Sequence, residues 1–185
     1  MSEIFRLNIP VYKNELREIY KKCTLKVVAY GDTPEHNAGA VNSFVTNKDD
    51  QEWVLTNLLD KCDIRHDVTN GYYPEEFGYP KEFNSFSCCF LTITNDITFS
   101  AHSDPNPAKI NFLINDSTTA PFRYVKTGET YFYDWPALLN VGKMHIVDNV
   151  ESLKEPRTTF QIVLNNTIDF YIEKFTNANL LIDRD

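Results

Sequence analysis

Two histidines and one aspartate in the second half of the chain have the residue types and spacing of a metal site. His102 and Asp104 are separated by one residue, so on an extended strand both side chains leave the same face and can reach one ion. His145 lies further along, within another segment of alternating apolar and polar residues. Two imidazoles and one carboxylate on one face of an ion suit non-haem Fe(II), because the remaining positions stay open for oxygen chemistry.

A permanent cation, Arg157, follows these predicted ligands. The polar segment 148–156 ends in Pro156 and is typical of a long hairpin loop. A hairpin centred near Glu151 predicts that His145 and Arg157 lie opposite each other on paired strands, with Cβ atoms within about 5 Å. The guanidinium could then hold the far carboxylate of a chelating dicarboxylic acid. The open positions of the ion would take the two oxygens of a 2-oxo acid and one molecule of O₂.

Four segments with a period of two residues are predicted to be the strands that position these groups. Asn111 and Lys109 face the same polar mouth and are candidates for contact with a cosubstrate or substrate, whereas Met144 and Ile146 belong to an apolar face. Together the strands predict a sandwich or barrel with a polar mouth, its outer face covered by N-terminal helices. The segments are 96–104, 109–114, 143–147 and 157–164.

The first half of the chain predicts helices and loops around this β region. Apolar stripes and acidic first turns favour helices, and one short apolar run favours a strand. An aromatic segment rich in Gly and Pro is predicted to be an irregular loop, either packed on the surface or forming a lid. Tyr124, Tyr131 and Tyr133 are expected to pack between strands. The predicted elements are helices at 10–23 and 48–62, a strand at 24–30, and loops at 31–43 and 70–86.

The stretch from about Phe90 to Leu164 resembles the core of the Fe(II)- and 2-oxoglutarate-dependent oxygenases. The signature of that family is HxD, a distal His, and an Arg near the start of the last core strand. Here these motifs are AHSDP, KMHIVDN and PRTTFQIVL. The resemblance implies a mainly β fold, the double-stranded β-helix of jelly-roll or cupin-like barrels, with the N-terminal helices packed on one sheet.

The same resemblance implies roles for individual residues. His102, Asp104 and His145 would bind Fe(II), and Arg157 would bind the distal carboxylate of 2-oxoglutarate. The predicted cosubstrate contacts also include Thr159, which matches the Ser or Thr that often assists that Arg, and Asn111 on the polar face. The short chain is similar to small prolyl-hydroxylase-like and aspartyl/asparaginyl-hydroxylase-like members, although many of the latter lack the carboxylate that Asp104 supplies.

The function expected from the resemblance is hydroxylation of a C–H bond by O₂, with release of succinate and CO₂. A protein side chain, a free amino acid and another small metabolite all remain possible substrates. Two alternatives stay open. One is a cupin-type metalloenzyme that does not use 2-oxoglutarate, and the other is a non-catalytic jelly-roll protein that binds a partner or has a structural role.

Composition restricts the other function classes. The chain has 185 residues and a net charge of −8, which argues against a nucleic-acid groove because phosphate backbones require clustered Lys and Arg. No apolar run reaches the roughly 18 residues of a membrane span. The four cysteines have no metal-ligand spacing and are expected to be reduced and buried in a cytoplasmic protein. One domain is predicted over 1–185, with N-terminal elements at 1–87, the barrel core at 88–170 and a tail at 171–185; the sequence does not determine the oligomeric state.

Overall fold

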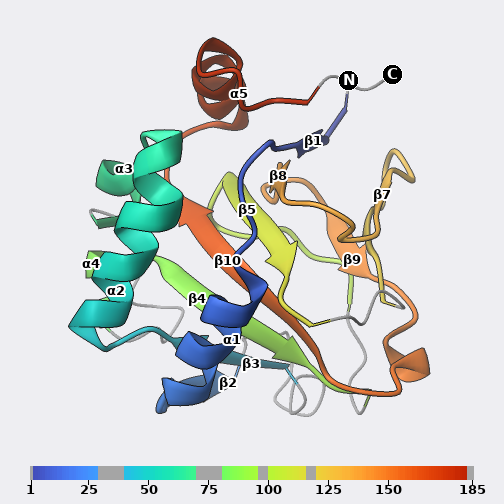
Figure 1. Cartoon of the computed structure of the whole chain (residues 1–185). Helices are drawn as coiled ribbons and strands as arrows, with labels where there is room; N and C mark the ends of the chain where they lie inside the picture. Colours follow the sequence, from blue (N-terminus) through green and yellow to red (C-terminus); the bar gives the residue numbers. More distant parts are fainter. Residues whose placement is uncertain (1, 29–39, 70–80, 96–99, 116–119, 183–185) are drawn as a thin grey trace.

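The described residues form three layers, with a seven-stranded sheet between a group of helices and a smaller three-stranded sheet (Figure 1). Every strand pair is antiparallel. The mainly β class predicted from the sequence is therefore confirmed. The computed structural model describes residues 2–28, 40–69, 81–95, 100–115 and 120–182.

The large sheet has the strand order β1-β8-β5-β10-β4-β3-β2, and the small sheet has the order β7-β6-β9. The strand β10 is at the centre of the large sheet and pairs with β4 on one side and β5 on the other. The bounds are β1 Ile4–Arg6, β2 Leu25–Val28, β3 Ala40–Phe44, β4 Cys88–Ile93, β5 Ala108–Leu113, β6 Phe122–Tyr124, β7 Thr130–Tyr131, β8 Ala137–Leu139, β9 His145–Val147 and β10 Arg157–Leu164.

From β4 onwards the chain crosses repeatedly between the two sheets. It leaves β4 in the large sheet, pairs with β9 of the small sheet through a bridge at His102, and returns to the large sheet as β5. It then forms β6 and β7, returns as β8, crosses again as β9, and ends in β10. These crossings place the polar ends of several strands around the space between the sheets. Within the described residues the two sheets do not close into a barrel.

The helices α1, α2, α3 and α5 cover one face of the large sheet, whereas Phe83 of α4 packs with Val163 on the other face. In α1, Leu16 and Ile19 are buried one turn apart, and the side chain of Asn47 caps α2 by accepting hydrogen bonds from two backbone amides. The helix α2 continues without a break into a π-helical turn and then a 3₁₀ turn. The bounds are α1 Lys13–Lys22, α2 Lys48–Val54, η2 Leu55–Leu59, η3 Asp60–Cys62, α3 Arg65–Thr69, α4 Glu82–Ser85, η5 Val150–Ser152 and α5 Ile168–Asn177.

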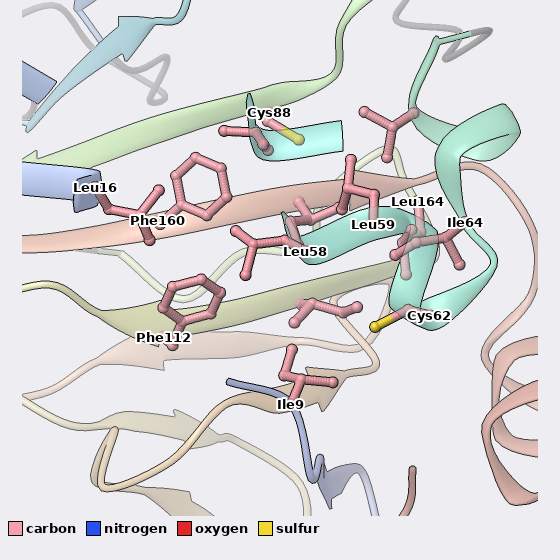
Figure 2. Packing of buried hydrophobic residues seen from close by; sticks show 14 of the residues in the cluster. Ile9, Leu16, Leu58, Leu59, Cys62, Ile64, Cys88, Phe112, Phe160 and Leu164 are labelled. Atoms are coloured by element: carbon pink, nitrogen blue, oxygen red, sulfur yellow. The ribbon is translucent and has the colours of Figure 1, made fainter. Parts of the chain in front are cut away.

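The main hydrophobic core lies between these helices and the large sheet. Phe112 and Phe160 come from neighbouring strands and point towards the helical layer, where Leu16 and Leu58 approach them (Figure 2). The rings of Phe112 and Phe160 have centroids 5.5 Å apart. The predicted cover of N-terminal helices over one sheet face is therefore present.

Most of the predicted regular elements are found, with several corrections. The strand predicted at 157–164 is β10, and the helix predicted at 10–23 is α1. The helix predicted at 48–62 is α2 together with its continuation in η2 and η3. Two other predictions were wrong in part, because packing against neighbouring elements overrides weak local signals. Residues 40–43 of the predicted loop 31–43 belong to β3, and residues 82–85 of the predicted loop 70–86 form α4. The predicted tail 171–185 begins within α5, which ends at Asn177. Residues 29–39, 70–80 and 96–99 lie outside the described residues, and with them most of the predicted aromatic loop or lid. The described part of the strand predicted at 96–104 holds a single bridge residue, His102.

The small sheet differs from the predicted pattern in the orientation of β9. Met144 is 48% exposed, whereas His145 and Val147 are buried. The apolar face predicted for 143–147 therefore points outwards, and the histidine face points towards the large sheet. In this segment the side chains that face the large sheet are buried, whether or not they are apolar.

Two further expectations can be compared with the structure. All four cysteines are free thiols with buried side chains, as predicted, and burial raises the pKa of Cys62 to about 11. Among the helices that the structure describes, none has the length and apolar character that crossing a membrane requires.

Candidate metal centre

The two histidines are brought together by their backbones. The amide of His102 donates to the carbonyl oxygen of His145 at 2.9 Å, and the amide of His145 donates back to the carbonyl oxygen of His102 at 2.7 Å. This reciprocal pair is the antiparallel bridge that joins the segment before β5 to β9. Residues paired in this way place their side chains next to each other on one face, and the two imidazole rings have centroids 4.5 Å apart.

Each imidazole is also held in the tautomer that a metal site needs. The Nδ1 atom of His102 is 2.9 Å from the carbonyl oxygen of Ser100, and Nδ1 of His145 is 2.8 Å from the carbonyl oxygen of Lys143. A carbonyl oxygen only accepts, so Nδ1 carries the proton in both rings and Nε2 keeps its lone pair. Backbone carbonyls that fix a ligating imidazole in this way are common around metal ions in proteins.

Asp104 completes the group. Its amide donates to the carbonyl oxygen of Val141 at 2.9 Å, which anchors the segment after His102, and its Oδ1 atom is 3.7 Å from Nε2 of His102. One donor atom from each of His102, Asp104 and His145 lies within 4.8 Å of the others. The three residues predicted from the sequence therefore converge in a group that could hold a metal ion.

The electrostatics of the group favour the protonation states of metal ligands. Burial lowers the pKa of His145 to about 4, although Asp104 opposes this shift, so the imidazole is neutral near pH 7. Burial alone would raise the pKa of Asp104, but Lys109 and the two histidines outweigh it and lower that pKa. A neutral imidazole and an ionised carboxylate are the forms that bind divalent cations.

The group opens into a cavity of about 90 Å³ between the two sheets. A single water needs roughly 10–15 Å³ by the same kind of measure, so the cavity has space for a small ligand. Phe122 of the small sheet forms part of the wall and stacks on His145 with ring centroids 4.6 Å apart. The described lining residues are Asn42, Leu91, His102, Asp104, Lys109, Asn111, Phe122, Tyr133, Val141, His145, Val147, Arg157 and Gln161.

Arg157 lines the same cavity and is 1% exposed. Its Nη1 atom donates to the carbonyl oxygen of Ala120, and its guanidinium carbon lies 4.5 Å from the centroid of the Tyr133 ring. Its Nε atom is buried without a hydrogen-bond partner, and within the part of the chain that the structure describes no carboxylate forms an ion pair with Arg157. A buried cation without a counter-ion is costly, so this arrangement is suited to binding an anion in the cavity.

The position of Arg157 differs from the prediction in one respect. The predicted hairpin between His145 and Arg157 was wrong, because β9 pairs with β6 whereas β10 pairs with β4 and β5. The two residues lie in different sheets and meet across the cavity. The segment 148–156 therefore crosses from one sheet to the other and includes the 3₁₀ turn η5.

The two predicted cosubstrate contacts have different surroundings. Asn111 lines the cavity, and its Oδ1 atom is buried without a hydrogen-bond partner among the described residues. Thr159 is fully buried, and its hydroxyl donates to the carbonyl oxygen of Leu91 at 3.5 Å. Assistance of Arg157 by Thr159 stays a prediction, because the hydroxyl is directed at the backbone of β4.

Several residues of the cavity wall were not among the predicted site residues. Gln161 shares the face of β10 with Arg157, so the alternation of that strand already pointed to it. Asn42 fell in a segment predicted to be a loop. Tyr133 was predicted to pack between strands, but it follows β7 with a left-handed backbone, φ 61°, and its ring lies against Arg157. No local signal marks this position, since non-glycine residues rarely adopt positive φ.

Comparison with known proteins adds no assignment: no protein-family description matches the chain, and neither does any curated protein. The donor set itself is compatible with Fe(II), since two imidazoles and one carboxylate on one side of a cavity leave the other side of an ion accessible.

Proposed function

We propose that this chain is an Fe(II)- and 2-oxoglutarate-dependent dioxygenase that hydroxylates a C–H bond of a protein side chain, an amino acid or a small metabolite. The observation that carries the proposal is Arg157, a buried guanidinium with no carboxylate partner among the described residues, in the same cavity as His102, Asp104 and His145. A metal group alone would suit many enzymes. A metal group and an unpaired buried cation in one cavity suit a ligand with one chelating end and one anionic end.

The path of the chain supports the same proposal. From β4 to β10 the chain crosses several times between the two sheets, as it does in a jelly roll. We propose that the described strands correspond to a double-stranded β-helix, the fold of the oxygenase family that the sequence resembles. The ends of β9 and β10 would then place His145 and Arg157 on the two walls of its mouth.

Each residue has a separate task in this proposal. His102, Asp104 and His145 would hold Fe(II), which when bound supplies open coordination positions and the electrons that reduce O₂. Arg157 would donate two N–H groups to the distal carboxylate of 2-oxoglutarate, while its other contacts hold the guanidinium in place. Asn111 would contribute a side-chain amide to the polar wall beside the cosubstrate.

Part of the remaining wall is apolar. Phe122 covers His145, and Leu91 and Val147 are apolar surfaces around the polar groups. Apolar surfaces that displace water strengthen the attraction between Arg157 and a carboxylate. The overall reaction consumes O₂ and 2-oxoglutarate with the C–H substrate, and it yields succinate, CO₂ and the hydroxylated product.

The test is to load the protein with Fe(II) without oxygen, add 2-oxoglutarate, admit air, and measure succinate. We expect slow succinate release by the wild type even without the C–H substrate. We expect His102→Ala to abolish it, because one imidazole ligand is lost. Arg157→Met should weaken 2-oxoglutarate binding roughly 100-fold, the loss expected when a charge-assisted pair is removed.

The controls separate the alternatives. Binding of 2-oxoglutarate to Mn(II)-loaded protein is measured by calorimetry, so that the result does not depend on the unidentified C–H substrate. A wild type that binds the ion but not 2-oxoglutarate, with Arg157→Met behaving identically, would contradict the proposal and favour a cupin-type enzyme. A wild type that binds no divalent ion would favour a non-catalytic binding or structural protein.

A further inference from the structure

Lys109 is held against the carboxylate of the candidate metal centre. Its Nζ atom is 2.6 Å from Oδ2 of Asp104, while Oδ1 of the same carboxylate is 3.7 Å from Nε2 of His102. The two oxygens of Asp104 therefore face different partners. Oδ1 faces the imidazole of His102, and Oδ2 faces the ammonium group of Lys109.

The fold limits where this ammonium can go. Lys109 is near the start of β5 and is paired on one side with Leu139 of β8 and on the other with Val163 of β10. Its side chain is only 12% exposed and lines the cavity. A lysine at the surface would turn its ammonium to water, but here both charges are largely desolvated, which makes their pairing strong and its loss costly.

We propose that Lys109 is a positioning residue that reserves Oδ2 of Asp104, so that Asp104 offers a metal ion one oxygen only. This inference rests on the proposed function and adds to it a reason why the centre keeps enough open positions. Two imidazoles and one carboxylate oxygen occupy three positions of a six-coordinate ion, and three remain for a 2-oxo acid and O₂. A carboxylate bound through both oxygens would leave only two.

A competing explanation makes a different prediction. Lys109 could simply be a substitute cation that neutralises Asp104 until an ion displaces it. Both explanations predict that Lys109→Met tightens metal binding, because a nearby positive charge is removed. Both also predict weaker binding of 2-oxoglutarate, because the cavity that takes this anion loses a cation. Only the positioning role predicts that the same variant changes the coordination of the ion.

The experiment compares wild type, Lys109→Met, Lys109→Arg and Lys154→Met after loading with Co(II), whose visible absorption reports the coordination number. Lys154 is an exposed lysine between β9 and β10 and serves as a control for the loss of one positive charge. For Lys109→Met we expect roughly 10-fold tighter Co(II) binding, a changed Co(II) spectrum, and roughly 10-fold weaker binding of 2-oxoglutarate to the Co(II)-loaded protein. Lys109→Arg should restore all three properties, and Lys154→Met should leave the spectrum unchanged.

Other outcomes overturn the inference. An unchanged Co(II) spectrum in Lys109→Met would identify Lys109 as a substitute cation, whatever the affinities for Co(II) and 2-oxoglutarate. Loss of Co(II) binding in a folded Lys109→Met would also contradict the positioning role. If that variant fails to fold, a crystal structure of the Co(II)-loaded wild type decides: Oδ2 must stay with Lys109, and both oxygens on the ion would refute the inference.

This design separates the inference from the proposed function. A wild type whose Asp104 binds Co(II) through Oδ1 alone, but which never binds 2-oxoglutarate, would retain the role of Lys109 and reject the dioxygenase. A wild type that releases succinate from 2-oxoglutarate while Asp104 binds the ion through both oxygens would support the dioxygenase and reject the role of Lys109.

Discussion

The two faces of β10 have opposite chemistry, although all eight residues of the strand are buried. Phe160, Ile162 and Leu164 point to the helical layer and belong to the main core. Arg157 and Gln161 point to the small sheet and line the cavity. One strand therefore contributes to a tightly packed apolar layer on one side and to a polar chamber on the other.

This contrast shows how the fold tolerates a costly site. Burying an apolar side chain stabilises a protein by about 1.5–3 kcal/mol, whereas a buried polar atom without a partner costs about 1–3 kcal/mol. Arg157 and Asn111 each have such an atom on the cavity side. The helical face of the same sheet supplies the stability that offsets these costs, so changes on the two faces should have different consequences.

The largest effect on stability is expected on the helical face. Phe160 is 0% exposed, so Phe160→Ala should lower the free energy of unfolding by about 3–5 kcal/mol through lost contacts and the cavity left behind. Urea unfolding measures this change. Phe170→Ala, at a ring that is 43% exposed, is the matched control and should cost much less. Equal losses in the two variants would contradict the assignment of the core.

A second effect comes from the cavity face and depends on pH. In the metal-free protein the folded-state pKa of His145 is about 4, below its ordinary value of 6.5. Between these two values the unfolded chain binds a proton that the folded chain does not, so stability falls as the pH is lowered from 6.5 towards 4. The full shift corresponds to about 3 kcal/mol.

Unfolding by urea with a chelator present, at several pH values from 7 to 5, measures this dependence. The matched variant is His145→Gln, which lacks the titrating group and should show a shallower decline of stability with falling pH. Parallel declines in the two proteins would mean that His145 is not responsible. Variants of the helical face should decline in parallel with wild type, because their residues do not titrate.

The smallest effect has the opposite sign. Asn111→Leu removes a buried acceptor that has no partner among the described residues, so it should raise the free energy of unfolding by about 1 kcal/mol. It should also weaken 2-oxoglutarate binding if the proposed function holds. Asn166→Leu, at an exposed position after β10, is the control with little expected change. If Asn111→Leu lowers the free energy of unfolding and Asn166→Leu does not, the Asn111 side chain has hydrogen-bond partners in solution.

The sequence predicted the two faces of β10 and the grouping of the candidate metal ligands. The alternation in 157–164 separates Phe160 from Arg157, and the one-residue spacing of His102 and Asp104 places both side chains on one side. The strand β10 and the convergence of the three candidate ligands follow from these patterns. The period and the spacing of residues depend only on the local sequence. Successive side chains of a strand point to opposite faces, so these patterns predict which residues share a face.

The same patterns do not predict which strands pair, or which side chains make contact, across long distances in the sequence. A polar segment ending in Pro156 predicts a hairpin, but the chain crosses to the other sheet there, and only the sheet pairing specifies this. Met144 is apolar yet exposed, because none of the layers formed by the described residues covers that side of the small sheet. The contact of Tyr133 with Arg157 depends on a positive φ that its residue type does not favour.

The reciprocal backbone hydrogen bonds between His102 and His145 have a consequence for how this protein can diverge. A one-residue insertion in either partner would turn one imidazole to the opposite side, whereas the segment 148–156 joins strands of separate sheets and carries no such pairing. Divergent relatives should therefore vary in the length of that crossover while preserving the alignment of the two histidine segments, which gives a criterion for recognising them even at low sequence identity.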